Sequence, residues 1–505
     1  MFCKLVSYAL NGLNPIEIQV EVDLNTGIPA FDIVGLPDSS VKESKDRIRS
    51  AINNSGFVFP VSRITINLAP ASIRKEGSLY DLPMAIAILQ CAGIVNNPKT
   101  NYLFFGELAL DGILRSSRQL FPIICALTAS PELQSFYFIV PKTSKHQLSC
   151  LNTDKILYAD TIKDVINFLN GRDSTLEQNQ TTNFIQHDDI IYNDYNDIYG
   201  QEYAKSALII AACGYHNLLL IGPPGSGKTM LSKSFPSLFP DLSFEQIIKL
   251  TQIYSLADLL PTNGLVTSRP FRTPHHTITP QALCGGGSNP RPGEISLSHL
   301  GILFLDELLE FSKKTLEILR QPLESKEITI SRAQHNVTYP ADFLLIASTN
   351  PCPCGYYPDL QKCSCSLPVV KKYLNKLSGP LLDRIDLHIE TQPIDFSNIN
   401  KTKAMSTSQM KEKVYIGLER QKHRFGTSNN ANMTVDQINK YCTLSETADT
   451  LLKSWLGASR SSARSYHKIL KIARTIADID DCELIGDTHI AQAIQYRSLD
   501  HAFFE

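Results

Sequence analysis

A glycine-rich turn, GPPGSGKT, occupies residues 222–229 between an apolar run and a helix-like segment. This strand–turn–helix order is typical of a phosphate-binding loop, in which backbone N–H groups wrap the phosphates of a nucleotide. Lys228 is expected to reach the β- and γ-phosphates, and Thr229 to offer its hydroxyl to Mg²⁺. The predicted nucleotide-binding residues of this turn are Gly222, Gly225, Ser226, Gly227, Lys228 and Thr229.

Two acidic residues, Asp306 and Glu307, follow the apolar run 301–305. In nucleotide-hydrolysing folds such a strand carries one acid that supports the Mg²⁺ shell and a second that polarises the attacking water. We assign Asp306 the first role and Glu307 the second. An acidic turn after a core strand is the alternative, and the phosphate-binding loop upstream disfavours it.

Asn350 ends a third strand-like run, residues 343–349. An amide at the carboxyl edge of a strand can orient the lytic water between Glu307 and the γ-phosphate. The alternative is that Asn350 is a turn former before Pro351. The three motifs together predict an ATP-hydrolysing site that uses Mg²⁺.

The composition is that of an ordinary globular protein: 505 residues, 43% hydrophobic and 19% charged, with a net charge of −2. This length predicts about two to four domains. Because the net charge is slightly negative, binding to a polyanion requires a local basic stripe. The start of the chain lacks a signal-peptide pattern, and no apolar run reaches the roughly 18 residues that span a bilayer. We therefore expect a cytoplasmic protein with no membrane partner.

Residues 1–170 are predicted to form a mixed α/β domain. Strand-like alternation covers 16–22 and 63–68, and helical patterns cover 39–53 and 82–91.

The rest of the chain divides into three further parts. The polar segment 171–196 is expected to be a linker, and residues 197–395 to form a parallel, helix-covered sheet that carries the nucleotide motifs. Residues 396–505 have helical periodicity, with Val414 and Leu418 and later Ile469, Ile472 and Ile476 spaced three or four apart, and are expected to form a small helical domain.

Three further stretches link the phosphate-binding loop to the acidic strand: RPFRTPHH at 269–276, CGGG at 284–287 and RPGEIS at 291–296. They resemble the magnesium-chelatase-like branch of the AAA+ ATPases. Over nearly its whole length the chain resembles the ComM/YifB family of bacterial proteins. The resemblance implies an α+β domain similar to the Lon protease domain (ribosomal S5-like), then an α/β P-loop AAA+ core with a parallel sheet, then a helical lid.

The resemblance also implies roles for two arginines. Arg384, within 378–386, resembles the arginine finger that acts on the γ-phosphate of a neighbouring subunit, where its planar fork stabilises transition-state charge. Arg464 resembles the sensor arginine of the lid. A surface salt bridge is the alternative for each. A finger that works on a neighbour implies a ring, and the resemblance implies a homo-hexamer.

The segments 75–79 and 106–112 resemble two stretches of Lon-type proteases, which use a serine nucleophile and a lysine base. Leu79 and Phe121 stand at the matching positions. Ser78 is adjacent to the first, but no lysine lies at the expected place. The domain is therefore expected to lack protease activity and to serve assembly or substrate guidance.

Four of the twelve cysteines lie in two C-x-C pairs: Cys352 with Cys354, and Cys363 with Cys365. Four thiolates this close together are a plausible tetrahedral set for a structural Zn²⁺. The spacing within each pair is tighter than the usual C-x₂-C. Two disulfides, disfavoured in a cytosolic chain, and reduced turn cysteines are the alternatives.

Two basic residues are candidates for contact with DNA: Arg272 in the insert 269–291, and Arg332 at the end of the first arm of a hairpin-like stretch, 327–339, that turns at 333–336. Six copies of Arg332 would line a pore with positive charge that tracks a phosphate backbone. An exposed hairpin charge is the alternative.

For the whole chain, the resemblance implies an ATP-driven DNA motor of the helicase or branch-migration type. Such a motor would act on single-stranded and branched DNA during natural transformation. The alternative is a protein remodeller or a magnesium-chelatase-like motor subunit. An active ATP-dependent protease is disfavoured by Leu79 and Phe121.

Overall fold

The computed structural model describes residues 1–98, 100–172, 175–181, 191–262, 264–287, 290–331, 336–393, 405–426, 428–459 and 463–497. The chain folds into two compact units. The first contains residues 1–187 and 244–267, and the second contains residues 188–243 and 268–505. Within the described ranges, none of the helices combines the length and the apolar character that crossing a bilayer requires.

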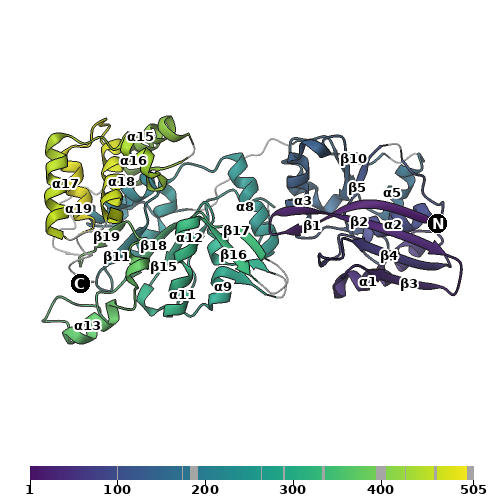
Figure 1. Ribbon diagram of the computed structural model, residues 1–505, viewed down its shortest axis with the longest axis horizontal. Helices are drawn as coiled ribbons and strands as arrows, with labels where there is room; N and C mark the ends of the chain where they lie inside the picture. Colours follow the sequence, from purple (N-terminus) through teal and green to yellow (C-terminus); the bar gives the residue numbers. More distant parts are fainter. Residues whose placement is uncertain are drawn as a thin grey trace. The chain divides into compact units, whose positions relative to one another are not determined.

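The first unit contains a four-stranded sheet in the order β1-β2-β4-β3 (Figure 1). Its strands are β1 (Phe2–Asn11), β2 (Asn14–Asn25), β3 (Ala30–Val34) and β4 (Arg63–Ala69). Only the β3–β4 pair is parallel among these strands. Alternate residues of β2 and β4 are buried, because one face of the sheet packs against helices α1 (Ser39–Asn54) and α2 (Asp81–Cys91). The predicted strands and helices of this region are confirmed.

A second sheet of the first unit has the order β10-β9-β8-β5. It consists of β5 (Tyr102–Phe104), β8 (Tyr137–Pro141), β9 (Ile156–Ala159) and β10 (Glu177–Gln178), and a separate short hairpin joins β6 (Glu107–Leu108) to β7 (Leu114–Arg115). Strand β10 lies inside the segment expected to be a linker. Helices α3 (Leu120–Ala129), α4 (Lys145–Leu148) and α5 (Ile162–Leu169) complete this part.

Helix α8 (Phe244–Ala257) belongs to the first unit although it follows the phosphate-binding loop in sequence. It packs against α3, and the Ser255 hydroxyl donates a hydrogen bond of 2.7 Å to the carbonyl of Arg118. The chain therefore leaves the second unit after residue 243 and returns to it at residue 268.

The second unit is built on a five-stranded parallel sheet in the order β12-β15-β18-β11-β19. The strands are β12 (Phe271–Arg272), β15 (Ile302–Leu305), β18 (Leu344–Thr349), β11 (Leu218–Ile221) and β19 (Leu387–Glu390). The three central strands are buried along their whole length, which explains their unbroken apolar sequences. The expected parallel sheet and its three motif-bearing strands are confirmed.

Further helices and two short ribbons belong to this part of the second unit. The helices are α6 (Glu202–Gly214), α7 (Lys228–Lys233), α9 (Pro280–Cys284), α10 (Glu294–Leu297), α11 (Lys313–Ile318), α12 (Arg320–Ser325), α13 (Leu367–Leu374) and α14 (Gly379–Leu382). A two-stranded ribbon, β13 (Gly285–Gly286) with β14 (Arg291–Pro292), lies within the insert. The expected hairpin is confirmed as β16 (Glu327–Ser331) paired with β17 (Asn336–Pro340), and Arg332 lies outside the described residues.

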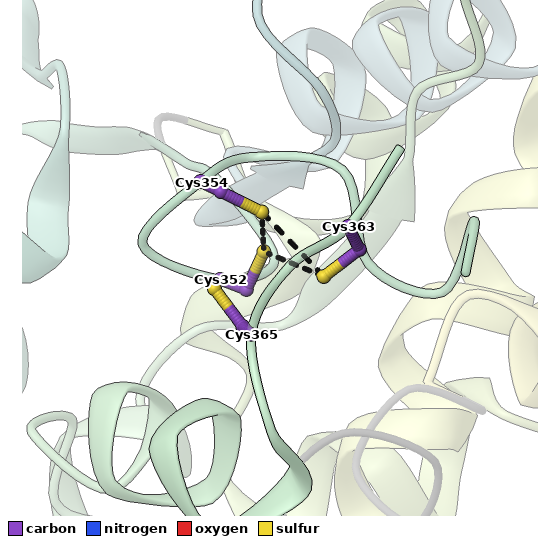
Figure 2. Close-up of side chains that lie close together, drawn as sticks. All are labelled: Cys352, Cys354, Cys363 and Cys365. Atoms are coloured by element: carbon purple, nitrogen blue, oxygen red, sulfur yellow. Dashed lines mark hydrogen bonds between the residues drawn. The ribbon is translucent and has the colours of Figure 1, made fainter. Parts of the chain in front are cut away.

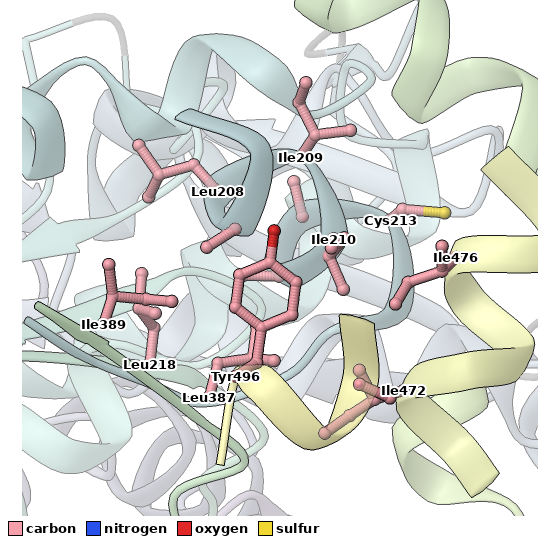
Figure 3. Packing of buried hydrophobic residues seen from close by; sticks show 14 of the residues in the cluster. Leu208, Ile209, Ile210, Cys213, Leu218, Leu387, Ile389, Ile472, Ile476 and Tyr496 are labelled. Carbon is pink, nitrogen blue, oxygen red and sulfur yellow. The ribbon is translucent and has the colours of Figure 1, made fainter. Parts of the chain in front are cut away.

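The C-terminal part is helical, as predicted. Its helices are α15 (Thr407–Phe425), α16 (Val435–Tyr441), α17 (Glu446–Ser459), α18 (Ala463–Ile479) and α19 (Asp487–Gln495). Figure 3 shows Ile472 and Ile476 of α18 facing α6, with Tyr496 between them and strand β19. One continuous apolar core thus joins these helices to the nucleotide-binding sheet.

Candidate ATP site

The phosphate-binding loop runs from the end of β11 to the start of α7, as predicted. Gly222 is the residue that most needs to be glycine, because an added Cβ would lie 2.1 Å from Thr391 Oγ1 and 2.4 Å from the Thr391 carbonyl oxygen. The Ser226 hydroxyl is 2.8 Å from the same Thr391 hydroxyl. Gly225 and Gly227 both have positive φ, at 76° and 86°. The segment after β19, which sequence reasoning did not connect with the loop, therefore holds its shape.

Lys228 turns its ammonium back into the phosphate-binding loop. Its Nζ atom donates to the carbonyls of Gly222 at 2.6 Å and Pro223 at 2.9 Å, and to Asn350 Oδ1 at 3.4 Å. The side chain is buried, and burial lowers the pKa of the ammonium to about 8 although Asp306 and Glu307 lie nearby. The structure thus brings Asn350 and Lys228 together.

Asp306 lies beside the start of helix α7, next to the phosphate-binding loop. Its Oδ2 atom accepts a hydrogen bond of 3.0 Å from the Thr229 hydroxyl, and Oδ1 accepts from the Ser348 hydroxyl. A hydroxyl and a carboxylate so arranged are hard oxygen ligands of the kind that suit Mg²⁺ beside nucleotide phosphates, so the residues fit that ion. Ser348 was missed by the sequence analysis, because one serine inside a buried strand has no distinctive pattern.

Glu307 begins the turn after β15 with a positive φ of 53°, a conformation that is uncommon outside glycine. Its carboxylate is 56% exposed, and its Oε2 atom lies 3.8 Å from His276 Nδ1. The sequence analysis placed His276 in the insert without linking it to the acid. Water reaches this carboxylate, as a group that polarises a lytic water requires.

The two candidate arginines meet at one carboxylate. Glu324 on α12 accepts a hydrogen bond from Arg384 Nη2, and it lies 3.5 Å from Arg464 Nη2. The hydrogen bond from Arg384 lowers the pKa of Glu324. The Arg384 side chain is 11% exposed and that of Arg464 is 46% exposed. Glu324 was missed by the sequence analysis because it lies far from both arginines along the chain.

The four clustered cysteines are free, and Figure 2 shows the sulfurs of Cys352, Cys354 and Cys363 facing one another with Cys365 close by. All four sulfurs lie within 4.8 Å of one another. A hydrogen bond from the Tyr356 amide lowers the pKa of the Cys354 thiol to about 6. Against the lowering effect of a backbone hydrogen bond, burial and the neighbouring thiols raise the pKa of Cys363 to about 12 and also raise that of Cys365.

Arg272 on β12 forms a two-pronged pair with Glu294, with Nε and Nη2 each 2.7 Å from a carboxylate oxygen. The Arg272 guanidinium group, which was predicted to contact DNA, is therefore paired with the Glu294 carboxylate. That contact stays a prediction, as does the one assigned to Arg332 outside the described residues.

The protease-like region of the first unit has apolar side chains where a catalytic pair would stand. Leu79 and Phe121 are each 1% exposed. The neighbouring Ser78 donates its hydroxyl hydrogen to Glu107, and the Lys75 ammonium donates to the Pro70 carbonyl. The absence of protease activity stays a prediction.

Comparison with known proteins places this geometry in a family. The family model described as "Magnesium chelatase, subunit ChlI" matches residues 194–399, and models of "Subunit ChlI of Mg-chelatase" and of the ChlI C-terminal part match residues 20–144 and 404–497.

Full-length relatives extend the match over almost the whole chain. YifB of Escherichia coli is 41% identical over 496 residues, which are 97% of this chain and 96% of that protein. The competence protein ComM of Haemophilus influenzae is 40% identical over 501 residues, 98% of this chain and 97% of its own length. Lon protease 2 of Bacillus subtilis is 23% identical over 229 residues, 40% of this chain and 41% of that protein. The chain therefore belongs to the ComM/YifB family of magnesium-chelatase-like AAA+ proteins.

Proposed function

We propose that this chain is an ATP-driven DNA motor that works as a homo-hexamer and moves branched or single-stranded DNA during recombination in natural transformation. The observation that carries the proposal is the group of side chains gathered at the carboxyl edge of one sheet: Lys228, Thr229, Asp306, Glu307 and Asn350. Near-full-length similarity to a protein named for competence supports DNA as the substrate. A structural Zn²⁺ on the four clustered cysteines is part of the proposal.

Each hydrolysis group has one task in this proposal. Mg-ATP supplies the scissile phosphoanhydride bond. The Lys228 ammonium moves from the loop carbonyls to phosphate oxygens. Thr229 and Asp306 would hold Mg²⁺, which would neutralise negative charge on the phosphates. Asn350 orients the attacking water, and Glu307 accepts its proton as the water oxygen bonds to the γ-phosphorus. The P–O bond to the β-phosphate breaks, and ADP leaves with that electron pair.

Arginines of a neighbouring subunit complete the site in this ring. The guanidinium group of Arg384 leaves Glu324 and donates hydrogen bonds to the γ-phosphate of the ATP bound by the neighbouring subunit. Arg464 shares the same carboxylate, so release of Glu324 frees both arginines together.

The test is the ATPase rate of the full chain with and without a four-way DNA junction, with branch migration scored in the same samples. Salt is varied between about 50 and 200 mM, because backbone contacts weaken steeply over that range. We expect salt-sensitive stimulation and ATP-dependent strand movement, and neither with the control variant Lys228→Ala. Full ATPase activity that is indifferent to DNA would refute the proposal.

A magnesium-chelatase-like motor or protein remodeller is the second candidate, favoured by the family model that matches residues 194–399. It predicts stimulation by an unfolded protein or by a porphyrin-binding partner instead of by DNA. Adding these to the same assay separates the two candidates.

A further inference from the structure

The fourteen residues from Cys352 to Cys365 form a surface loop that lacks an apolar core of its own. In this loop, which the structure describes throughout, only Cys352 and Gly355 are buried, whereas Leu360 is 80% exposed and Tyr356 is 41% exposed. Ordering a residue costs about 1–2 kcal/mol of backbone entropy, and so little apolar burial does not offset that cost. The loop therefore needs a cross-link to keep one conformation.

Three of the four thiols in this loop have separations close to those in a tetrahedral metal site, and the sulfur of Cys365 lies within 4.8 Å of them. Sulfur–sulfur distances are 3.3 Å between Cys352 and Cys354, 3.5 Å between Cys354 and Cys363, and 3.8 Å between Cys352 and Cys363. Zn–S bonds of about 2.3 Å in a tetrahedron place sulfurs about 3.8 Å apart. The Tyr357 amide also donates to Cys352 Sγ at 3.4 Å, an outer contact of the kind that orients a metal-bound thiolate.

This loop directly contacts the ATP site. It begins two residues after Asn350, whose Oδ1 atom accepts a hydrogen bond from Lys228. At Gly355 the backbone has a φ of 87°, and an added Cβ would lie 2.6 Å from Pro224 Cδ and 3.9 Å from Asn350 Cγ. The loop backbone thus lies against the tip of the phosphate-binding loop and against the amide assigned to the lytic water.

We propose that Cys352, Cys354, Cys363 and Cys365 bind one Zn²⁺, and that the metal-bound loop is a buttress that fixes Pro224 and Asn350 for ATP hydrolysis. Binding releases the thiol protons, and four protein ligands leave no open position, so the ion is structural. Loss of the metal frees the loop, and Asn350 and the phosphate-binding loop then lose their support. This inference about the loop assumes the proposed ATPase activity, but it does not require DNA to be the substrate.

The first test measures metal content and nucleotide chemistry separately, without DNA. We expect about one Zn²⁺ per purified chain, as a four-thiolate site holds a single ion. The double variant Cys363→Ser/Cys365→Ser should lose the metal, bind a fluorescent ATP analogue more weakly and hydrolyse ATP at least tenfold more slowly. The control Cys482→Ser alters a half-exposed cysteine of the same unit outside the loop and should change none of these.

A second variant isolates the contact from the metal. Gly355→Ala keeps all four thiols and should retain zinc, yet its Cβ pushes against Pro224 and should slow hydrolysis. A chain that holds no zinc even after zinc is supplied would overturn the metal site. Normal ATP hydrolysis by both the metal-free double variant and Gly355→Ala would overturn the buttress. Neither result depends on DNA, so failure of the DNA motor proposal remains distinguishable.

Discussion

Lys228 has an ammonium whose charge depends on pH within the range of ordinary assays. Burial lowers its pKa to about 8, and its hydrogen bonds in the described structure go to carbonyl and amide oxygens of the phosphate-binding loop and Asn350. The group is charged below that pH and neutral above it. Nucleotide affinity should therefore follow the charge of this single residue.

We expect ATP affinity to fall as the pH rises through about 8, by up to roughly tenfold for each pH unit above it, since the neutral amine cannot pair with phosphate. Titration of a fluorescent ATP analogue at pH 7, 8 and 9 measures this. Lys228→Arg keeps its charge throughout and should lose the dependence. Constant affinity of the unaltered chain over this range would contradict the prediction.

Glu307 and Glu310 provide a matched pair for testing the general base, since both lie in the turn after β15. Glu307→Gln should still bind ATP but hydrolyse it at least about 100-fold more slowly, because the amide cannot accept a proton. Glu310→Gln should hydrolyse at a near-normal rate. Single-turnover ATPase assays with a parallel binding measurement check both, and normal turnover by Glu307→Gln would remove it from the catalytic role.

At the scale of elements, an ion pair connects helix α18 to the loop that contains Arg384. Lys468 on α18 lies 2.9 Å from Asp386, two residues beyond Arg384, and His216 Nδ1 lies 3.6 Å from the same carboxyl group. Burial alone would raise the pKa of Asp386, but Lys468 and His216 hold it well below its usual range. This pair therefore stabilises the fold above the ordinary pKa of an aspartate, and its contribution is lost as the pH falls through the lowered value.

Lys468→Met should destabilise the second unit by about 3 kcal/mol at neutral pH, because it removes the ammonium nearest the buried Asp386 charge and leaves that charge only its contacts with His216 and the Asn217 amide. Trp455 on α17 is the single tryptophan of the chain, so its fluorescence during urea unfolding reports this unit. The control Lys453→Met removes an exposed pair with Asp449 on the same helix and should leave the midpoint unchanged. Equal midpoints for the two variants would show that the buried pair contributes little.

At the scale of the whole molecule, the chain passes between its two units three times, at about residues 188, 244 and 268. The segment 244–267, which returns to the first unit, contains α8. The buried residues Ile247, Leu250 and Ile253 of this helix belong to the first unit. The nucleotide motifs therefore lie on both sides of a segment that folds with the protease-like part. Separating the two parts at one linker would remove α8 from its packing partners.

Assembly provides the prediction at this scale. Arg384→Ala should form the same oligomer as the unaltered chain but hydrolyse ATP poorly, because the proposed site takes this arginine from a neighbour. Mixing Arg384→Ala with the equally inactive Lys228→Ala should restore part of the ATPase rate, since some interfaces then combine an intact loop with an intact arginine. Size-exclusion chromatography and ATPase assays of the mixtures measure this, and mixtures no faster than their components would refute action across the interface.

The sequence alone determined the strands, the glycine-rich turn and the helices, because each depends mainly on residues that are close together in the chain. The apolar runs of β11, β15 and β18 and the glycine-rich turn after the first of them are encoded locally. Parallel strands bring their carboxyl ends to one edge, so Lys228, Asp306 and Asn350 could be placed together from the sequence. The helical periodicity of the C-terminal part was equally readable, because buried faces of helices repeat every three or four residues.

Only the tertiary structure decided the contacts between residues far apart in the chain. The Ser348 bond to Asp306, the approach of His276 to Glu307, and the meeting of Arg384 and Arg464 at Glu324 belong to this group. So does the return of α8 to the first unit. Each is set by how whole elements pack and which side chains then reach one another, and a local pattern of residue types does not contain that information.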